Sequence, residues 1–134
     1  MQRAELFRKQ VGEELERIPF GNRRPKELYD PIVYTLEGGG KRMRPVLLLL
    51  GCDLFGGNTA AALAPAAGIE IFHNFTLLHD DIMDNAPMRR SRPTVHGKWN
   101  RNIAILSGDV MFVESYALMA RAPGAVLPQV LHTF

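Results

Sequence analysis

Clusters of glycine and proline cut this sequence into stretches that favour helices, and this punctuation restricts the possible folds more than any other feature. Between the clusters, no long run alternates apolar and polar residues as a half-buried strand would. The pattern predicts helices over residues 3–18, 26–36, 42–55, 59–84 and 98–120, another from about 125, and a loop over 85–97. Val46–Leu50 could form a buried strand, but one strand needs partners that the sequence does not offer. We therefore expect an all-α fold.

Composition narrows the class of protein. The 134 residues suffice for one domain with a modest core, and a net charge of +2 without a basic stripe gives no reason to expect nucleic acid as a partner. The only cysteine, Cys52, cannot form an internal disulfide and is expected to be buried and inert. The polar N-terminus is unlike a secretory signal, and the longest apolar run is far shorter than the ~20 residues of a membrane span. These features predict a soluble, cytoplasmic protein without stable membrane insertion.

Three aspartates follow directly on the apolar part of the predicted 59–84 helix, in the stretch LLHDDIMDNAPMRR. At about 100° per residue, Asp80 and Asp84 lie on one face together with His73 and Thr76. Two carboxylates one turn apart repel each other, and the negative end of the helix dipole adds to that repulsion. A cation would offset both effects, and Mg²⁺ typically binds one or two carboxylates together with substrate phosphates.

The same stretch permits other interpretations. The aspartates could form a solvated acidic cap, or could pair internally with the two arginines that follow them. An EF-hand is excluded because DDIMDN lacks the alternating ligands and the glycine of that loop. The pair His79 and Asp80 could belong to an HD-type phosphohydrolase, whose further ligands would come from other helices. His96 and His132 are available, but no feature of the sequence favours them.

A second unusual stretch is GGGKRMRP, residues 38–45. It is not a Walker A motif, because the spacing fails and Arg42 stands where a serine or threonine would hold Mg²⁺. Three glycines before a helix N-terminus still expose backbone N–H groups to an anion, and Lys41 and Arg44 add charge that can grip phosphate oxygens. A flexible turn flanked by solvated bases is the alternative. Together with the aspartates, the stretch favours a metal-bridged diphosphate with an apolar tail.

Four motifs resemble those of the trans-isoprenyl diphosphate synthases, also called polyprenyl synthetases. In chain order they are GGGKRMRP, HNFTLLHDDIMD, RRSRPTVH and ILSGDVMF. They cover about residues 37–115, and the order of DDIMD, RR and RPT is specific to that family. The resemblance implies the helical bundle of the isoprenoid synthases, with residues 1–134 as the N-terminal portion of one polyprenyl synthetase domain.

The resemblance also implies a reaction. An allylic prenyl diphosphate ionises, the double bond of isopentenyl diphosphate attacks the carbocation, and a proton is lost. Asp80 and Asp84 would bind Mg²⁺ on the allylic diphosphate, with Asp81 as a supporting residue or occasional ligand, and Arg89 would contact the same diphosphate. The diphosphate of isopentenyl diphosphate would be held by four side chains, those of Lys41, Arg44, His73 and Arg90.

Product length follows from the same resemblance. In similar enzymes, the residues four and five positions before the first aspartate help to form the floor of the hydrocarbon pocket. Here they are Thr76 and Phe75, and a bulky residue at the second position implies a short product. On a helical wheel, Thr76 lies on the aspartate face and Phe75 lies about 100° further round. We expect an all-trans product of fifteen to twenty carbons, with the geranylgeranyl length favoured.

Complete members of this family are over twice as long and carry a second aspartate-rich motif, which no stretch after Asp109 matches. Asp109 itself is expected to be structural. The chain ends in LPQVLHTF, an apolar segment without a polar tail. We therefore expect part of a longer protein that is inactive alone, and a homodimer for the full-length protein. A non-catalytic regulatory subunit of a prenyl diphosphate synthase is the alternative, although the intact DDIMD and RR argue against it.

Overall fold

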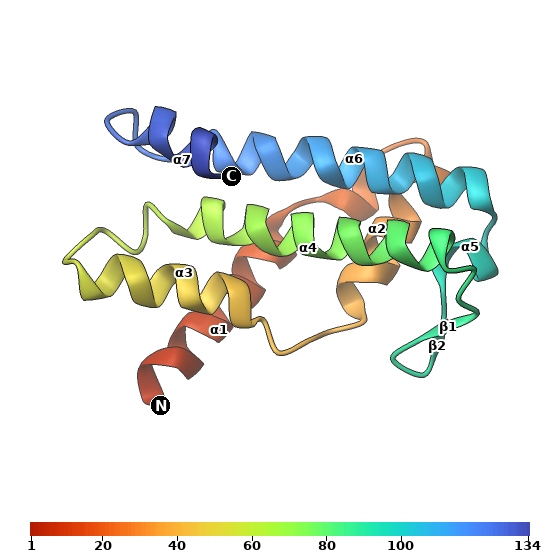
Figure 1. The fold of residues 1–134 in the computed structure, drawn as a ribbon, viewed down its shortest axis with the longest axis horizontal. Coiled ribbons are helices and arrows are strands. Elements are labelled where there is room, and N and C mark those ends of the chain that lie inside the picture. Colours follow the sequence, from red (N-terminus) through yellow and green to blue (C-terminus); the bar gives the residue numbers. More distant parts are fainter. The chain divides into compact units, whose positions relative to one another are not determined.

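The computed structural model describes all 134 residues, Met1 to Phe134, and its helices confirm the all-α fold (Figure 1). The helices are α1 (Gln2–Arg17), α2 (Lys26–Glu37), α3 (Met43–Leu54), α4 (Leu63–Met83), α5 (Val95–Lys98), α6 (Arg101–Met119) and α7 (Leu127–Thr133). None of them combines the length and the apolarity needed to span a lipid bilayer.

Four short elements were not predicted. A 3-10 helix, η1 (Phe20–Asn22), precedes α2. The expected loop after α4 contains an antiparallel hairpin of β1 (Met88–Arg89) and β2 (Arg92–Pro93), followed by α5. The fourth helix also begins later than predicted, at Leu63, because the side chain of Asn58 accepts the N–H groups of Ala60 and Ala61 and holds a turn there.

Packing divides the chain into two units. Unit 1 contains Met1–Ile18, Lys41–Glu70 and Glu114–Phe134, and unit 2 contains Pro19–Gly40 and Ile71–Val113. The long helices α4 and α6 each contribute their residues to both units.

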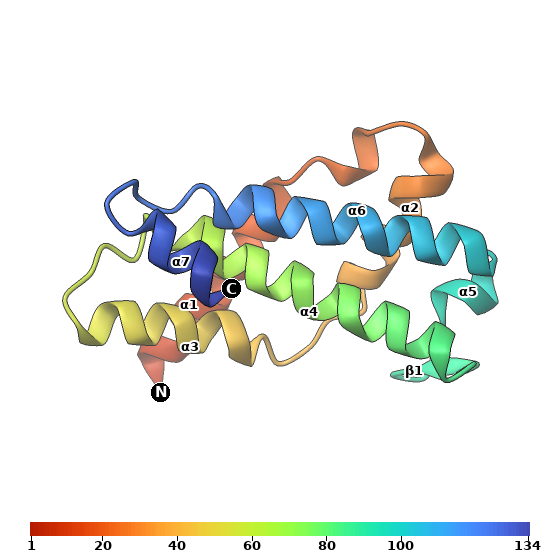
Figure 2. The ribbon, with the colours of Figure 1, turned by 45° about the horizontal axis from the view of Figure 1, so that its top comes forward.

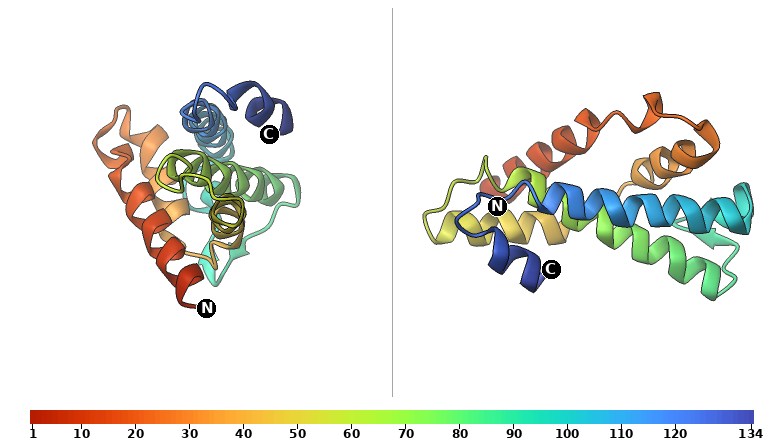
Figure 3. Two further views of the ribbon diagram at one scale, coloured as in Figure 1. Left: turned by 90° about the vertical axis from the view of Figure 1, so that its left-hand side faces the viewer. Right: turned by 90° about the horizontal axis from the view of Figure 1, so that it is seen from above.

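In unit 1, α1 packs against α3 (Figure 3). The residues that α1 buries, Phe7, Val11 and Leu15, recur every four positions and form one apolar stripe. Gly68 on α4 approaches α6 so closely that an added Cβ would lie 2.9 Å from the main-chain oxygen of Ser115. Cys52 on α3 is only partly buried, less than the sequence suggested.

In unit 2, residues 71–83 of α4 lie alongside residues 101–113 of α6 (Figures 1 and 2). The approach depends on Gly108, since a Cβ at that position would lie 2.3 Å from Nε2 of His79. The fully buried Ser107 donates its hydroxyl to the main-chain oxygen of Leu28 at 2.8 Å, which ties α6 to α2. This close packing gives the end of α4, where the aspartates lie, a rigid support.

Candidate functional site

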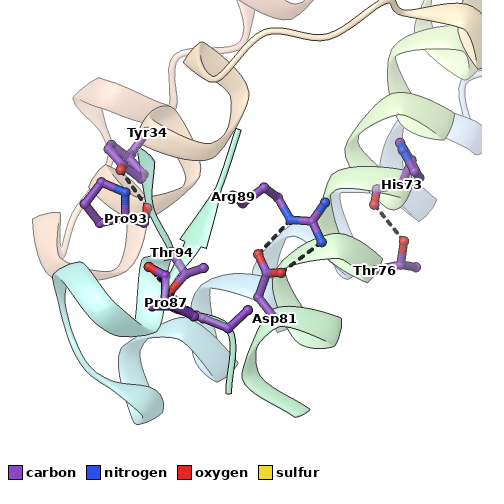
Figure 4. Close-up of polar contacts among 9 residues, drawn as sticks. Tyr34, His73, Thr76, Asp81, Pro87, Arg89, Pro93 and Thr94 are labelled. Carbon is purple, nitrogen blue, oxygen red and sulfur yellow. Dashed lines mark hydrogen bonds and ion pairs between the residues drawn. The ribbon is translucent and has the colours of Figure 1, made fainter. Parts of the chain in front are cut away.

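Asp81 and Arg89 form a two-pronged ion pair at the end of α4 (Figure 4). Nε and Nη2 of Arg89 donate to the two carboxylate oxygens of Asp81, each at 2.8 Å. Asp81 is only 7% exposed, and Arg89 is half-buried. Bidentate pairing between arginine and a carboxylate is among the strongest hydrogen-bonded arrangements in proteins. Of the alternatives that the sequence left open, internal pairing is therefore found for Asp81 with Arg89.

The three aspartates act together on the Arg89 guanidinium. The hydrogen bond from Arg89 to Asp81 raises the pKa of Arg89 above its ordinary value, burial opposes this rise, and the charges of Asp81, Asp80 and Asp84 reinforce it. Because an arginine is protonated in proteins even without such help, the effect of the aspartates is to hold the guanidinium in place.

Asp80 and Asp84 are both exposed, in contrast to Asp81. The N–H of Asp84 donates to the main-chain oxygen of Asp80 at 2.9 Å, so helical geometry continues to Asp84 and keeps the two residues one turn apart. No group of three or more His, Cys, Asp or Glu side chains is placed to hold a metal ion. Two exposed carboxylates still suit Mg²⁺, which commonly takes its other ligands from substrate oxygens and water.

The hairpin after α4 turns through Arg90 and Ser91, whose φ angles are 52° and 62°. Positive φ at both central residues is the mark of a type I′ turn, the turn whose twist suits a two-residue hairpin. Arg90 donates from Nη1 to the main-chain oxygen of Gly39, in the glycine stretch that follows α2. The hairpin thereby lies against the start of the predicted anion loop.

Arg92 and Tyr34 fasten the other side of the hairpin to α2. The Arg92 guanidinium carbon lies 3.9 Å from the centre of the Tyr34 ring, and Nη1 of Arg92 is 3.3 Å from the Tyr34 main-chain oxygen. The Tyr34 hydroxyl donates to the main-chain oxygen of Pro93 at 2.8 Å (Figure 4). The sequence analysis did not single out Arg92. Its place in the RPT motif, which the sequence analysis noted as specific, is the signal that could have found it.

These contacts border a pocket in unit 2 that is formed by α2, the hairpin, α4 and the first residue of α5. Leu77, Leu78 and Val95 supply apolar lining, and the charged lining comes from Asp81, Arg89, Arg90 and Arg92. Asp80 and Asp84 do not line it. The pocket therefore joins the paired Asp81 and three guanidinium groups to an apolar wall, while the two exposed carboxylates stand outside it.

The predicted chain-length residues differ in their surroundings. The Thr76 hydroxyl donates to the main-chain oxygen of His73 at 2.7 Å, within its own helix (Figure 4). The Phe75 ring belongs to an aromatic cluster, with ring centroids 5.5 Å from Phe72, 5.2 Å from Phe112 and 4.7 Å from His79. Three neighbouring rings restrict the orientations that Phe75 can adopt.

In the glycine–basic stretch, Gly39, Gly40 and Arg42 have positive φ angles of 71°, 148° and 50°. Lys41 and Arg44, the predicted phosphate ligands, are exposed and belong to unit 1, whereas His73 and Arg90 belong to unit 2. Arg42 behaves differently from both. Its side chain is largely buried and forms an ion pair of 2.7 Å with Glu70 on α4.

The histidines do not gather around Asp80 as an HD-type phosphohydrolase would require. Nε2 of His79 lies 3.2 Å from the main-chain oxygen of Ile105 and 4.0 Å from Oδ1 of Asp109. Neither His96 nor His132 belongs to a cluster that could hold a metal ion. His79 instead contributes to packing between α4 and α6, and the structure shows Asp109 with its side chain 61% exposed at the edge of that contact, without the capping or pairing inside its own helix that would confirm a structural role.

Comparison with known proteins identifies the family. The polyprenyl synthetase family model matches residues 25–134. The geranylgeranyl diphosphate synthase of Methanosarcina mazei is 43% identical over 98 residues, which cover 73% of this chain and 30% of that protein. That of Saccharolobus solfataricus is 45% identical over 97 residues, covering 72% and 29%. The chain therefore belongs to the polyprenyl synthetase family.

A solved structure supports the same assignment at the level of the fold. The geranylgeranyl pyrophosphate synthetase from Pyrococcus horikoshii aligns with a TM-score of 0.90 at 37% identity. The alignment covers 98% of this chain and 40% of that one. The chain thus has the fold of the N-terminal part of an isoprenoid synthase, and it spans less than half the length of the relatives that it matches.

Proposed function

We propose that the protein containing this chain is a Mg²⁺-dependent prenyltransferase that condenses an allylic prenyl diphosphate with isopentenyl diphosphate. The observation that carries the proposal is the exposed pair of Asp80 and Asp84, one turn apart beside the paired Asp81 and Arg89. Family membership and the names of the similar proteins support it.

The charged residues have separate roles in this reaction. Asp80 and Asp84 would hold Mg²⁺, which when bound neutralises charge on the allylic diphosphate as its carbon–oxygen bond breaks. Arg89 stabilises the same departing diphosphate, and Asp81 orients the Arg89 guanidinium through its two hydrogen bonds. Because these groups are held before the reaction starts, little reorganisation is needed as charge develops.

The second substrate meets a different set of side chains. Four residues hold the diphosphate of isopentenyl diphosphate on this proposal, namely Lys41, Arg44, His73 and Arg90. The exposure of Lys41 and Arg44 and the turn that presents Arg90 at the pocket support this assignment. Apolar residues on α4 keep water away from the carbocation, which would otherwise be quenched.

We also propose a product of fifteen to twenty carbons, with geranylgeranyl diphosphate favoured. Phe75 would limit the chain, with Thr76 beside it, and the aromatic cluster around Phe75 supports a fixed barrier. The full-length protein would be a homodimer, for which the exposed Leu106, Phe112 and Val113 on α6 offer apolar surface. The 134-residue chain alone should not turn over, because it holds only the first of the two aspartate-rich motifs that the family uses.

The test is to incubate the full-length protein with labelled isopentenyl diphosphate, an allylic diphosphate and Mg²⁺. Chain extension is expected for the wild type, with a large loss in Asp80→Asn and in Asp84→Asn. Asp109→Asn is the matched control, since Asp109 is also an exposed aspartate and its side chain is 61% exposed. No reaction would favour the non-catalytic regulatory subunit, and release of phosphate without chain extension would favour a phosphohydrolase.

A further inference from the structure

We propose that Arg42 and Glu70 are positioning residues. Their buried ion pair holds the backbone of the basic loop so that its two flanking cations, Lys41 and Arg44, meet the diphosphate of isopentenyl diphosphate together. The inference deepens the proposed function and rests on it, because Lys41 and Arg44 have that ligand only in the proposed reaction.

The ion pair is placed as an anchor. Nη1 of Arg42 lies 2.7 Å from Oε1 of Glu70, and the two side chains are 14% and 6% exposed. Lys41 and Arg44 on either side of Arg42 are both exposed. Because the Arg42 guanidinium is this deeply buried and already pairs with Glu70, it is shielded from a ligand in solvent. The three cations of the stretch are therefore divided between one inward anchor and two outward bases.

The backbone at Arg42 shows what the anchor does. Arg42 adopts the left-handed backbone conformation, with φ 50° and ψ 35°. Residues other than glycine, asparagine and aspartate rarely adopt it. Residues keep such conformations where surrounding contacts impose them, and the Glu70 pair is a contact of that kind. Arg42 is also the N-cap of α3, and its carbonyl accepts the N–H of Val46 at 3.2 Å. Its conformation therefore sets the direction in which α3, with Arg44 in its first turn, begins.

A second contact restrains the other side of the loop. Nε of Arg8 on α1 donates to the main-chain oxygen of Lys41 at 3.2 Å. The main chain of Lys41 is thus held by α1, while its neighbour Arg42 is held by α4. Glu70 moreover lies on α4, the helix that also contains Asp80.

The experiment uses the full-length protein and separates positioning from folding. Four variants are compared with the wild type. Arg42→Asn removes the ion pair but tolerates the left-handed backbone, and Arg42→Lys keeps the positive charge. Glu70→Gln removes the negative charge. The double variant Arg42→Met with Glu70→Leu replaces both charged side chains by apolar ones that can remain stable when buried. Arg3→Ala is the control, since it removes the exposed pair that Arg3 forms with Asp53 between α1 and α3 in the same unit.

The readouts are the thermal midpoint, kcat, and the KM of each substrate. A misplaced base weakens one charge-assisted contact, so we expect the KM for isopentenyl diphosphate to rise about tenfold in Arg42→Asn and in the double variant. The KM for the allylic diphosphate should stay within about twofold of the wild type, because the variants do not alter Arg89 or the aspartates proposed to contact that substrate. Arg42→Lys should recover part of the loss, and Arg3→Ala should leave both KM values unchanged.

Two results would overturn the inference while leaving the reaction intact. One is a double variant with wild-type thermal midpoint and an unchanged KM for isopentenyl diphosphate, and the other is an equal rise in both KM values. Lys41→Ala tests separately whether the basic loop binds isopentenyl diphosphate at all. If that variant extends chains with an unchanged KM for isopentenyl diphosphate, the basic loop does not bind this substrate and the inference fails with that assignment.

Discussion

Replacing Asp81 by asparagine isolates what the carboxylate does for Arg89. Asparagine has nearly the same shape, but its amide oxygen can accept only one of the two hydrogen bonds and its NH₂ group faces a guanidinium that only donates. Arg89 keeps its charge and loses its support. Asp81→Asn therefore tests the position of the guanidinium without deleting it.

The size of the effect follows from burial. Removing one partner of a fully buried ion pair costs about 3–5 kcal/mol, whereas an exposed pair contributes about 0.5 kcal/mol. The Asp81 side chain is 10% exposed but that of Arg89 is 38% exposed, so solvent screens one end of the pair. We expect an intermediate loss of about 2 kcal/mol in the free energy of unfolding, which corresponds to a fall of roughly 5 °C in the thermal midpoint.

The pH dependence provides an independent check on the same variant. Asp81 raises the pKa of Arg89, so the stabilisation is fully present below the ordinary arginine pKa and is lost only as the pH rises through the elevated value. Both values lie above any working pH. The pH profile of kcat between about pH 6 and 9 should therefore be the same in Asp81→Asn as in the wild type, while kcat itself falls by at least about tenfold.

The assay measures thermal unfolding and initial rates of the full-length protein at several pH values. Asp81→Glu should recover part of both losses because it restores the charge, and Asp109→Asn serves again as the exposed control. Unchanged stability together with an unchanged rate in Asp81→Asn would refute the positioning argument. A shift of the pH profile would refute the argument that only geometry is altered.

Three further predictions concern packing and product length. Gly108→Ala should lower stability by about 1–3 kcal/mol in denaturant unfolding, since its Cβ would meet His79, whereas Gly51→Ala on α3 has no atom within 4 Å of its Cβ and should gain up to about 1 kcal/mol. Ser107→Ala should cost about 1 kcal/mol in the same measurement through its lost hydrogen bond to α2. Phe75→Ala should lengthen the product beyond twenty carbons by mass spectrometry, and an unchanged product would contradict its role in chain length.

Much of the fold could be predicted from the sequence because the residues that begin and end helices act locally. Glycine ends two helices close to where the sequence places their ends, at Gly38 after α2 and at Gly56 after α3. The hairpin escaped prediction because strands of two residues are too short to show alternation. Its turn also lacks the Asn-Gly or Asp-Gly pair that normally marks a type I′ turn, with Arg90 and Ser91 in their place.

In the candidate site, too, the local features could be predicted and the contacts between distant residues could not. Helical spacing was enough to predict that Asp80 and Asp84 lie one turn apart, since the turn after α4 continues the helical hydrogen bonding to Asp84. The partners of Asp81 and Arg42 could not be read from spacing, because each is reached through a loop or from another helix. For Asp81 the sequence left the internal pair open as an alternative. For Arg42 only the three-dimensional fold reveals that it turns inward.

The type I′ turn sets stability and activity against each other at Arg90. A φ of 52° is strained for arginine, and glycine would relieve about 1 kcal/mol there. On the role proposed for Arg90, the same replacement would remove a cation from the pocket. A library of variants selected only for survival on heating should therefore drift toward glycine or asparagine at this position, whereas one selected for turnover should retain arginine despite the strain.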